Sequence, residues 1–119
     1  MRVSCMTPPD DRIRLAHLRE AAEKAVQLAQ GTSRQGLEDD EVLRLALTKL
    51  IEIVGEAAKQ TSAPTRLSIP GVPWSAAARM RDRLIHHYFD IDIDVLWATL
   101  SDDLPKLLDA LPPNIDPLS

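Results

Sequence analysis

The sequence is poor in cysteine, glycine and aromatic residues, and it has no long apolar run. Its 119 residues include 1 cysteine, 4 glycines, 2 tryptophans, 1 tyrosine and 1 phenylalanine. The lone Cys5 excludes an intrachain disulfide and a cysteine-based zinc site, and it favours a reducing compartment. The few glycines form no phosphate-binding loop, and no stretch approaches the ~18 apolar residues of a transmembrane helix. The N-terminal residues lack the apolar core of a signal peptide, so we expect a cytoplasmic protein.

Acidic residues outnumber basic ones in this chain. It has 18 Asp and Glu residues against 14 Lys and Arg residues, which gives a net charge of −4. This balance argues against a general polyanion binder, so any contact with nucleic acid must come from a local basic patch. Apolar residues make up 45% of the chain. Because alanine and leucine dominate them and aromatics are few, helices are favoured over a β-sandwich or barrel.

Apolar residues recur at helical spacing along most of the chain. They predict an all-α fold, an up-and-down bundle of about four or five helices. Prolines and a glycine mark residues 61–73 as a loop, and Pro105 predicts a kink or a fresh helix start in the last helical region. The expected helices run from about residue 13 to 29, from 37 to 60, from 74 to 87 and from 93 to 111.

The chain length fits one domain with a full hydrophobic core. We predict a single helical domain at residues 10–112, preceded by a flexible extension at residues 1–9. A loose tail at residues 113–119 is expected to follow, because Pro112 and Pro113 end the last helical pattern.

The helix expected at residues 37–60 is apolar on more than one face. Its apolar residues run from Val42 to Ala58 and are too numerous for a single stripe. Such a helix is buried on two sides, and in so short a chain a second subunit can cover one of them. Gly55 lies within this helix, where glycine costs about 1 kcal/mol relative to alanine, and we attribute it to close packing against another helix.

One segment, residues 79–90, concentrates groups that can carry chemistry. It holds three arginines, the adjacent His86 and His87, and two aromatic residues, against the acidic Asp82. The run forms a local cationic patch on an acidic protein. Composition alone leaves a second interpretation equally open, a solvated helix face followed by a capping turn.

Helical geometry limits how these groups can combine. At ~100° per residue, Arg81 and Tyr88 share a helix face, whereas Arg81 and His86 are about 140° apart. A single site that uses all three therefore needs the helix to end near His86, or two copies of the chain that face each other. His86 and His87 diverge by about 100° and have no third ligand at helical spacing, so a metal site is not favoured. We interpret the isolated His17 as structural or exposed.

Histidine beside arginine, without a metal, suits RNA cleavage. Histidine can accept the proton of a 2′-hydroxyl or donate one to the 5′-oxygen leaving group near neutral pH. The arginine guanidinium offers a planar fork of donors to a phosphate as its charge builds in the transition state. The attacking oxygen belongs to the RNA, so the protein needs no nucleophile of its own.

The spacing Arg81, four residues, His86, one residue, Tyr88 resembles the signature of the HepT-like HEPN ribonuclease toxins. The string around it, MRDRLIHHYFDID, is similar to that family, as are IVGEAAKQTS in the preceding helix and DLPKLLDAL near the end of the chain. The resemblance covers roughly residues 10–112. The bare spacing is a weak signal, whereas the string with its flanks is specific.

The resemblance implies a helical homodimer in which the two signature motifs line a basic cleft at the dimer interface. It implies a metal-independent endoribonuclease that needs no cofactor. Arg81 and His86 are then catalytic, Asp82 supports Arg81, and Tyr88 is a modification site. The remaining members of the cationic patch are expected to bind RNA; these are Arg79, Arg83 and His87.

The resemblance also implies partners. The substrate is RNA, either tRNA or mRNA, and the antitoxin of this type II or type VII toxin–antitoxin system is a minimal nucleotidyltransferase of the MntA type. That antitoxin adds AMP to the signature tyrosine, here Tyr88. An alternative of another class stays open, a non-catalytic dimeric helical module that holds the nucleotidyltransferase. In that case Arg81 and His86 would be interface groups, and purified protein would not cleave RNA.

Overall fold

The computed structural model describes residues 9–85 and 90–113, which are almost entirely helical. Within them there is no strand, only an isolated antiparallel bridge between Ile85 and Ile91. The predicted all-α class is therefore confirmed. The elements are α1 (Pro9–Ala29), α2 (Arg34–Asp39), α3 (Glu41–Gln60), α4 (Ala63–Ser68), α5 (Trp74–Ala78), α6 (Met80–Leu84), α7 (Ile93–Ala98), the π-helical turn η2 (Thr99–Asp103) and α8 (Leu104–Ala110).

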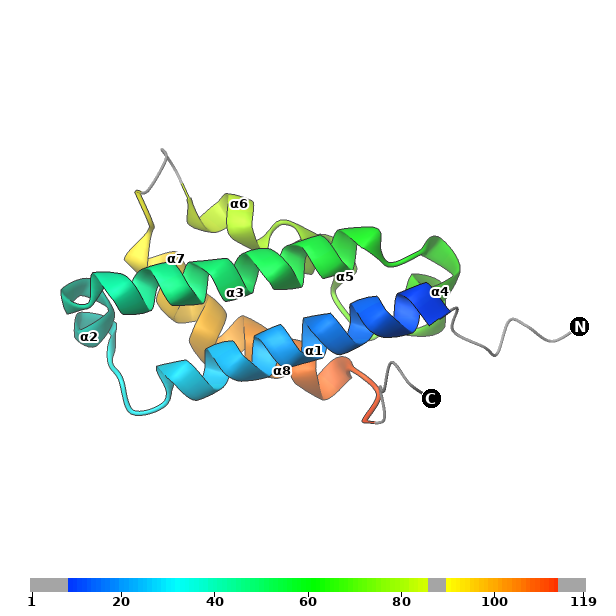
Figure 1. Cartoon of the computed structure of the whole chain (residues 1–119), viewed down its shortest axis with the longest axis horizontal. Coiled ribbons are helices and arrows are strands. Elements are labelled where there is room, and N and C mark those ends of the chain that lie inside the picture. The colour runs from blue at the N-terminus through cyan, green and yellow to red at the C-terminus, as the bar shows by residue number, and fades with distance from the viewer. Residues whose placement is uncertain (1–8, 86–89, 114–119) are drawn as a thin grey trace, which may run out of the picture.

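Successive passes of the chain run in alternating directions, as Figure 1 shows. The long helices α1 and α3 lie side by side and antiparallel, and they form the most extensive helix pair. From the far end of α3 the chain returns along the same helix through α5 and α6. It then turns back through α7, which packs on α2 and α6, and through η2 and α8, which pack on α1. None of the helices in the described residues is long and apolar enough to cross a membrane.

The helix α3 is buried on two sides, as its apolar pattern predicts, and within a single chain. One side packs on α1, and the C-terminal half of the other side packs on α5 and α6. Leu47, Ile51 and Val54 are fully buried in these contacts. The N-terminal half of α3 instead leaves Val42 77% and Leu45 47% exposed. Part of the apolar excess of α3 therefore has no cover within the described chain.

The predicted second helix begins later than expected, because its acidic start is a capping site. Residues 34–39 form the separate helix α2, capped by the Ser33 hydroxyl, which accepts a hydrogen bond from the Gly36 backbone N–H. Asp40 then adopts an extended conformation, and its carboxylate accepts from the Leu43 N–H at 2.9 Å. An aspartate that satisfies a free N–H of the next helix is more stable as a cap than as a helical residue.

The predicted loop at residues 61–73 was wrong in part, since it contains the short helix α4. Pro64 lies in the first turn of α4, where a missing N–H costs nothing because no carbonyl precedes it in the helix. The signal taken for a chain break therefore marks a helix start.

Gly31 lies just beyond the C-terminus of α1. Its φ of +80° is the left-handed conformation that a residue after a helix end commonly adopts.

The last helical region is divided by a π-helical turn. The ring of Pro105 clashes with the carbonyl four residues earlier in a regular α-helix. The chain widens at η2 (Thr99–Asp103), and α8 starts at Leu104 with the proline in its first turn. Ala98, Asp103 and Leu104 all keep right-handed helical dihedrals, so the chain stays helical through η2. Pro105 is accommodated by the π-helical turn rather than by the predicted fresh helix start. Asp92 caps α7 by accepting from the Val95 N–H at 3.1 Å, as the acidic connection before it indicates.

A buried aspartate joins the start of α1 to the start of α4. Asp11 is 1% exposed. It accepts hydrogen bonds from the Ser62 backbone N–H at 3.1 Å, from the Thr65 hydroxyl at 2.5 Å and from the Ser62 hydroxyl, and it pairs with Arg14 at 3.2 Å. Burial raises the pKa of Asp11, but these hydrogen bonds outweigh it and hold the pKa below its ordinary value. The carboxylate therefore caps α4 from a distant helix.

We expect Asp11→Asn to lower the free energy of unfolding by about 2 kcal/mol at pH 7, because an amide cannot accept all of these hydrogen bonds as a charged group does. The folded pKa of Asp11 is lower than the unfolded one. The contribution of Asp11 is therefore complete above the unfolded value of about 3.8 and is lost as the pH falls through the folded value. Urea unfolding of wild type and variant between pH 7 and pH 3 measures both effects.

The matched control is Asp109→Asn, which removes an exposed carboxylate on α8. It should leave the stability at pH 7 and the acid dependence of wild type unchanged. If Asp11→Asn loses stability with falling pH as steeply as wild type, Asp11 is not the titrating group.

Candidate active site

The structure places the arginines of the signature segment on and beside the short helix α6. Arg79 links α5 to α6, and Arg81, Asp82 and Arg83 lie within α6. All four side chains are exposed. The predicted site residues His86, His87 and Tyr88 lie outside the described residues, so their predicted roles stay predictions. The third predicted helix is corrected in two ways, since it is divided at Arg79 and ends at Leu84.

The division at Arg79 coincides with a close contact between α5 and α3. A Cβ atom on Gly55 would lie 3.3 Å from the Ala78 carbonyl oxygen and 3.4 Å from that of Ala77. The missing side chain of Gly55 lets the last turn of α5 rest directly on α3, which confirms the close packing predicted for this glycine. Arg79 then leaves the helical conformation (φ −103°, ψ 4°), and α6 starts at Met80 in a new direction.

The end of α6 is fixed by backbone pairing with the segment before α7. Ile85 is extended (φ −106°, ψ 120°) and forms the bridge with Ile91. Beside it, the Asp92 N–H donates to the Leu84 carbonyl at 2.9 Å. The helix therefore ends two residues before His86. The sequence leaves two arrangements open for a site with Arg81 and His86. The first requires the helix to end near His86, and the structure meets this requirement.

Arg81 is held from α3 by an acidic residue that the sequence analysis did not identify. The Arg81 Nε donates to Glu52 Oε2 at 2.9 Å, and the Lys49 ammonium donates to the other oxygen, Oε1, at 2.9 Å. The Lys49 hydrogen bond is the main cause that lowers the pKa of Glu52; burial opposes it, and Arg81 adds to it. Glu52 thus remains ionised and orients the guanidinium through one edge only, which leaves the terminal nitrogens toward solvent.

The predicted support from Asp82 is weaker in the structure than the contact from Glu52. Asp82 Oδ1 lies 3.8 Å from Arg81 Nη1, at the limit of an ion pair between exposed groups. Arg83 points to a different partner, with its Nη1 atom 3.8 Å from an oxygen of Asp103 in η2. The cationic patch is therefore partly neutralised by carboxylates from α3 and η2.

A shallow hollow of about 220 Å³ lies beside Arg81, between α3 and the junction of α5 with α6. Its walls include Gly55 and Ala78, two cations, Lys59 and Arg81, and three carboxylates, Glu52, Glu56 and Asp82. The carboxylates oppose an anion inside the hollow, so a phosphate would contact Arg81 at its solvent-exposed part. Within residues 9–85 and 90–113, no three His, Cys, Asp or Glu side chains converge as metal ligands would.

Comparison with known proteins identifies the family of this chain. The model of the family described as "Ribonuclease HepT-like" matches residues 18–112, which include α6 and the whole signature segment. The chain belongs to the HepT-like ribonuclease family. The predicted enzyme class, a ribonuclease, is confirmed at this level, as is the resemblance found in the sequence.

Several curated proteins are similar to this HepT-like chain over most of its length. A protein of Thermococcus cleftensis named "Probable ribonuclease HepT" is 37% identical over 94 residues, which cover 76% of this chain and 86% of that protein. One of Caldanaerobacter subterraneus, named as a "Putative RNase", is 34% identical and covers 78% and 83%, respectively. Another so named, of Methanocaldococcus jannaschii, is 29% identical and covers 86% and 94%. No solved structure matches this chain.

We expect Glu52→Ala to lower the rate of RNA cleavage about tenfold without a change in melting temperature. The Arg81 guanidinium would lose its orientation, and a small misplacement of a charged group costs this much or more. An exposed ion pair contributes little to stability, so the fold should be unaffected. Glu52→Gln should retain most of the activity, because the amide oxygen still accepts from Arg81 Nε. Single-turnover cleavage and thermal unfolding measure the two effects.

Glu56→Ala is the matched control. Glu56 lies one turn further along α3 and lines the same hollow, but its carboxylate accepts a hydrogen bond from the Gln60 side chain at 3.1 Å. Both substitutions remove one negative charge beside the site, and only Glu52→Ala removes the contact with Arg81. Equal rates for the two variants would show that Glu52 does not position Arg81.

Proposed function

We propose that this HepT-like chain is the metal-independent endoribonuclease toxin of a type II or type VII toxin–antitoxin system. The observation that carries the proposal is the Arg81 guanidinium. It is held at one edge by Glu52, stands half-exposed over a hollow, and lies on a helix that ends two residues before His86. Family membership supplies the reaction class, and tRNA or mRNA in the cytoplasm is the proposed substrate.

The proposed reaction is an attack of the RNA on its own backbone. The imidazole of His86 accepts the proton of the 2′-hydroxyl, and the 2′-oxygen bonds to the adjacent phosphorus. The 5′-oxygen leaves with its electron pair and takes the proton from the His86 imidazolium, so the products end in a 2′,3′-cyclic phosphate and a 5′-hydroxyl. Arg81 stabilises the charge that develops on the phosphoryl oxygens. Asp82 supports Arg81, and Arg79, Arg83 and His87 bind neighbouring phosphates.

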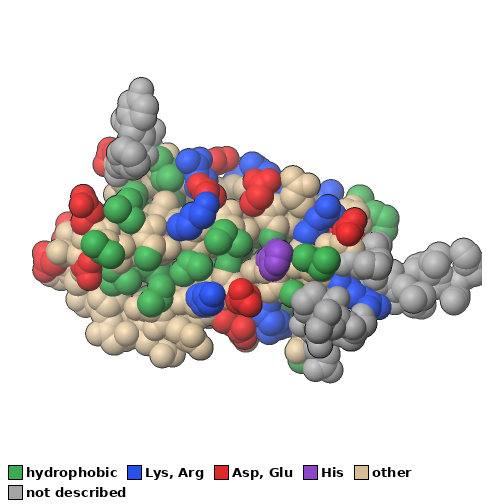
Figure 2. All heavy atoms as spheres, viewed as in Figure 1, with side chains coloured by type: hydrophobic (Ala, Val, Ile, Leu, Met, Phe, Trp, Pro, Cys, Tyr) green, Lys and Arg blue, Asp and Glu red, His purple; other side chains and the backbone are tan. Residues whose placement is uncertain are grey.

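A homodimer is part of the proposal. Large apolar side chains remain exposed on α1 and on the N-terminal half of α3, from Ile13 at 40% to Val42 at 77%. Figure 2 shows hydrophobic side chains gathered along the face where α1 and α3 lie together. A contiguous apolar surface of this kind favours association with a second copy. Two HEPN-like chains would then bring their signature segments to a common cleft.

The proposed regulator is a nucleotidyltransferase antitoxin of the MntA type. The phenol oxygen of Tyr88 attacks the α-phosphorus of ATP, pyrophosphate leaves, and AMP is joined to the tyrosine. The added phosphate would compete with RNA phosphate for the arginines of the site, because both are anionic acceptors for the guanidinium fork. Inhibition would follow from occupied charge and steric blockage.

We expect His86→Ala to abolish detectable RNA cleavage by purified protein, since acid–base catalysis supplies about 10²–10⁴-fold. Arg81→Lys should also be inactive, because lysine lacks the planar fork of donors. His87→Ala should be much milder. Wild-type cleavage should persist in EDTA and leave 2′,3′-cyclic phosphate ends, which mass spectrometry of the fragments identifies.

The control is Arg34→Lys on α2, which conserves an exposed cation far along the chain and should cleave like wild type. Circular dichroism should give the same helical content for every variant, and sedimentation velocity should give a dimer. Wild-type activity in His86→Ala, or a strict need for a divalent metal, would refute the mechanism. A complete lack of cleavage by wild-type protein would favour the alternative, a non-catalytic module that holds the nucleotidyltransferase.

We expect Tyr88→Phe to retain ribonuclease activity but to escape inactivation by the nucleotidyltransferase with ATP, because it lacks the acceptor oxygen. Intact-mass spectrometry should find added adenylate on wild type and none on the variant. The control is His86→Ala, which keeps the tyrosine and should still be modified. If Tyr88→Phe is modified and silenced as readily as wild type, the acceptor is another residue.

A further inference from the structure

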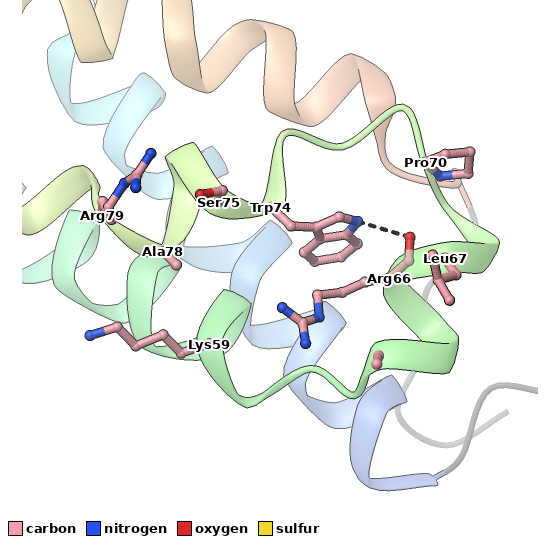
Figure 3. Close-up of a pocket in the computed structure, with 9 residues that line it drawn as sticks. Lys59, Arg66, Leu67, Pro70, Trp74, Ser75, Ala78 and Arg79 are labelled. Carbon is pink, nitrogen blue, oxygen red and sulfur yellow. Dashed lines mark hydrogen bonds between the residues drawn. The ribbon is translucent and has the colours of Figure 1, made fainter.

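A second, larger hollow lies along α5, from Trp74 at its start to Arg79 after its end. It has a volume of about 670 Å³, which is in the range of nucleotide-sized ligand sites. We call it the Trp74 groove; its principal walls are Lys59, Arg66, Leu67, Pro70, Trp74 and Arg79. Figure 3 shows Trp74 in the middle, with Lys59 and Arg79 to its left, the Arg66 side chain below the ring, and Leu67 and Pro70 to its right.

The indole ring of Trp74 is held in place by its edge. Its Nε1 atom donates to the carbonyl oxygens of Arg66 and Ile69, each at 3.1 Å, which ties the ring to the end of α4 (Figure 3). The ring is nevertheless only partly buried and lines the groove. An aromatic ring with its polar edge satisfied and its orientation set by the backbone is a prepared surface for stacking. Leu67, 80% exposed, adds an apolar rim.

The cations around the Trp74 groove are not neutralised by the protein. In the described part of the chain, Lys59, Arg66 and Arg79 form no ion pair, and no acidic residue lines the groove. The other lysines and arginines there, apart from Arg12 and Arg44, each pair with a carboxylate. On a chain with a net charge of −4, this local excess of positive charge favours an anionic ligand.

The Trp74 groove adjoins the hollow beside Arg81. Lys59 and Ala78 line both, and Arg79 stands between Trp74 and Arg81 along the chain. A strand whose phosphate contacts the half-exposed Arg81 side chain can therefore extend past Lys59 into the groove. A planar, apolar group with a phosphate on either side matches this sequence of contacts, and a strand of nucleotides has that chemistry.

We propose that the Trp74 groove is a subsite for one unpaired nucleotide of the RNA strand, next to the phosphodiester bound at Arg81. Its base stacks on the Trp74 ring, and Lys59, Arg66 and Arg79 bind the phosphates that flank it. A stacked base must be free of its pairing partner, so the groove selects single-stranded segments such as loops and ends. The inference rests on the proposed ribonuclease function and adds where the substrate binds and in what form.

The test measures binding apart from cleavage. The probe is an unpaired 2′-O-methyl hexanucleotide, which has no free 2′-hydroxyl and is not cut. Trp97→Phe leaves Trp74 as the sole tryptophan. We expect saturable quenching of its fluorescence by the hexanucleotide and much weaker binding of a duplex of the same sequence. Trp74→Leu should weaken binding about tenfold, measured by anisotropy of a labelled probe, whereas Trp74→Phe, which still stacks, should retain most of it.

Exposed charges supply a second set of variants that spares the fold. Lys59→Gln with Arg79→Gln should weaken binding and flatten its dependence on salt, because fewer counterions are released. The matched control is Lys24→Gln with Lys106→Gln, which removes two exposed cations elsewhere and should leave binding unchanged. Three results would each overturn the proposal. The first is unchanged affinity both in Trp74→Leu and in the Lys59→Gln, Arg79→Gln double variant. The others are binding of the duplex as tight as that of the unpaired hexanucleotide, and quenching by a poly-glutamate peptide equal to that by the hexanucleotide.

The outcomes for this subsite and for the proposed function are separable. One outcome is that wild-type protein cleaves RNA while the hexanucleotide neither quenches Trp74 fluorescence nor binds more weakly to Trp74→Leu. In that case the proposed subsite is wrong and the proposed ribonuclease function stands. If the hexanucleotide binds at Trp74 as expected but wild-type protein does not cleave RNA, the subsite stands and the catalytic proposal falls.

Discussion

The close approach of α5 to α3 at Gly55 is the contact on which the rest of the site depends. With no side chain at Gly55, the carbonyl oxygens of Ala77 and Ala78 lie directly against α3. That approach ends α5, redirects the chain at Arg79 and lays α6 along α3, where Arg81 meets Glu52. The Lys59 and Ala78 side chains beside this contact line both the Arg81 hollow and the Trp74 groove.

Charge is distributed so that an acidic protein can present positive groups locally. Arg81 is oriented by Glu52, and Arg83 faces Asp103, so both are partly neutralised. The cations around Trp74 have no such partners in the described residues, so no neighbouring carboxylate there offsets their positive charge. A ligand with phosphates can therefore bind where its charge is not opposed, whereas general attraction of polyanions is weak because the net charge is negative.

Local chemistry explains which helix boundaries could be predicted and which could not. Gly31 and Asp92 end and start helices as their residue types suggest, because a left-handed turn and a carboxylate cap are local requirements. Asp40 and Pro64 were assigned to the wrong side of a boundary. Each is compatible with either position, and the choice depends on contacts made elsewhere, such as the hydrogen bonds of Ser62 and Thr65 to Asp11.

By itself the sequence determined the helical class, the two buried sides of α3, the need for close packing at Gly55 and the segment that carries the signature. These depend on periodicity, residue size and neighbouring residues, which a linear sequence contains. Only the tertiary structure decided that Glu52 orients Arg81 across 29 positions and that α6 ends at Leu84. It also decided that Trp74 shares a groove with three cations from separate elements that form no ion pair within the described residues. These features depend on contacts between segments far apart in the chain, and such contacts are set by how the helices pack.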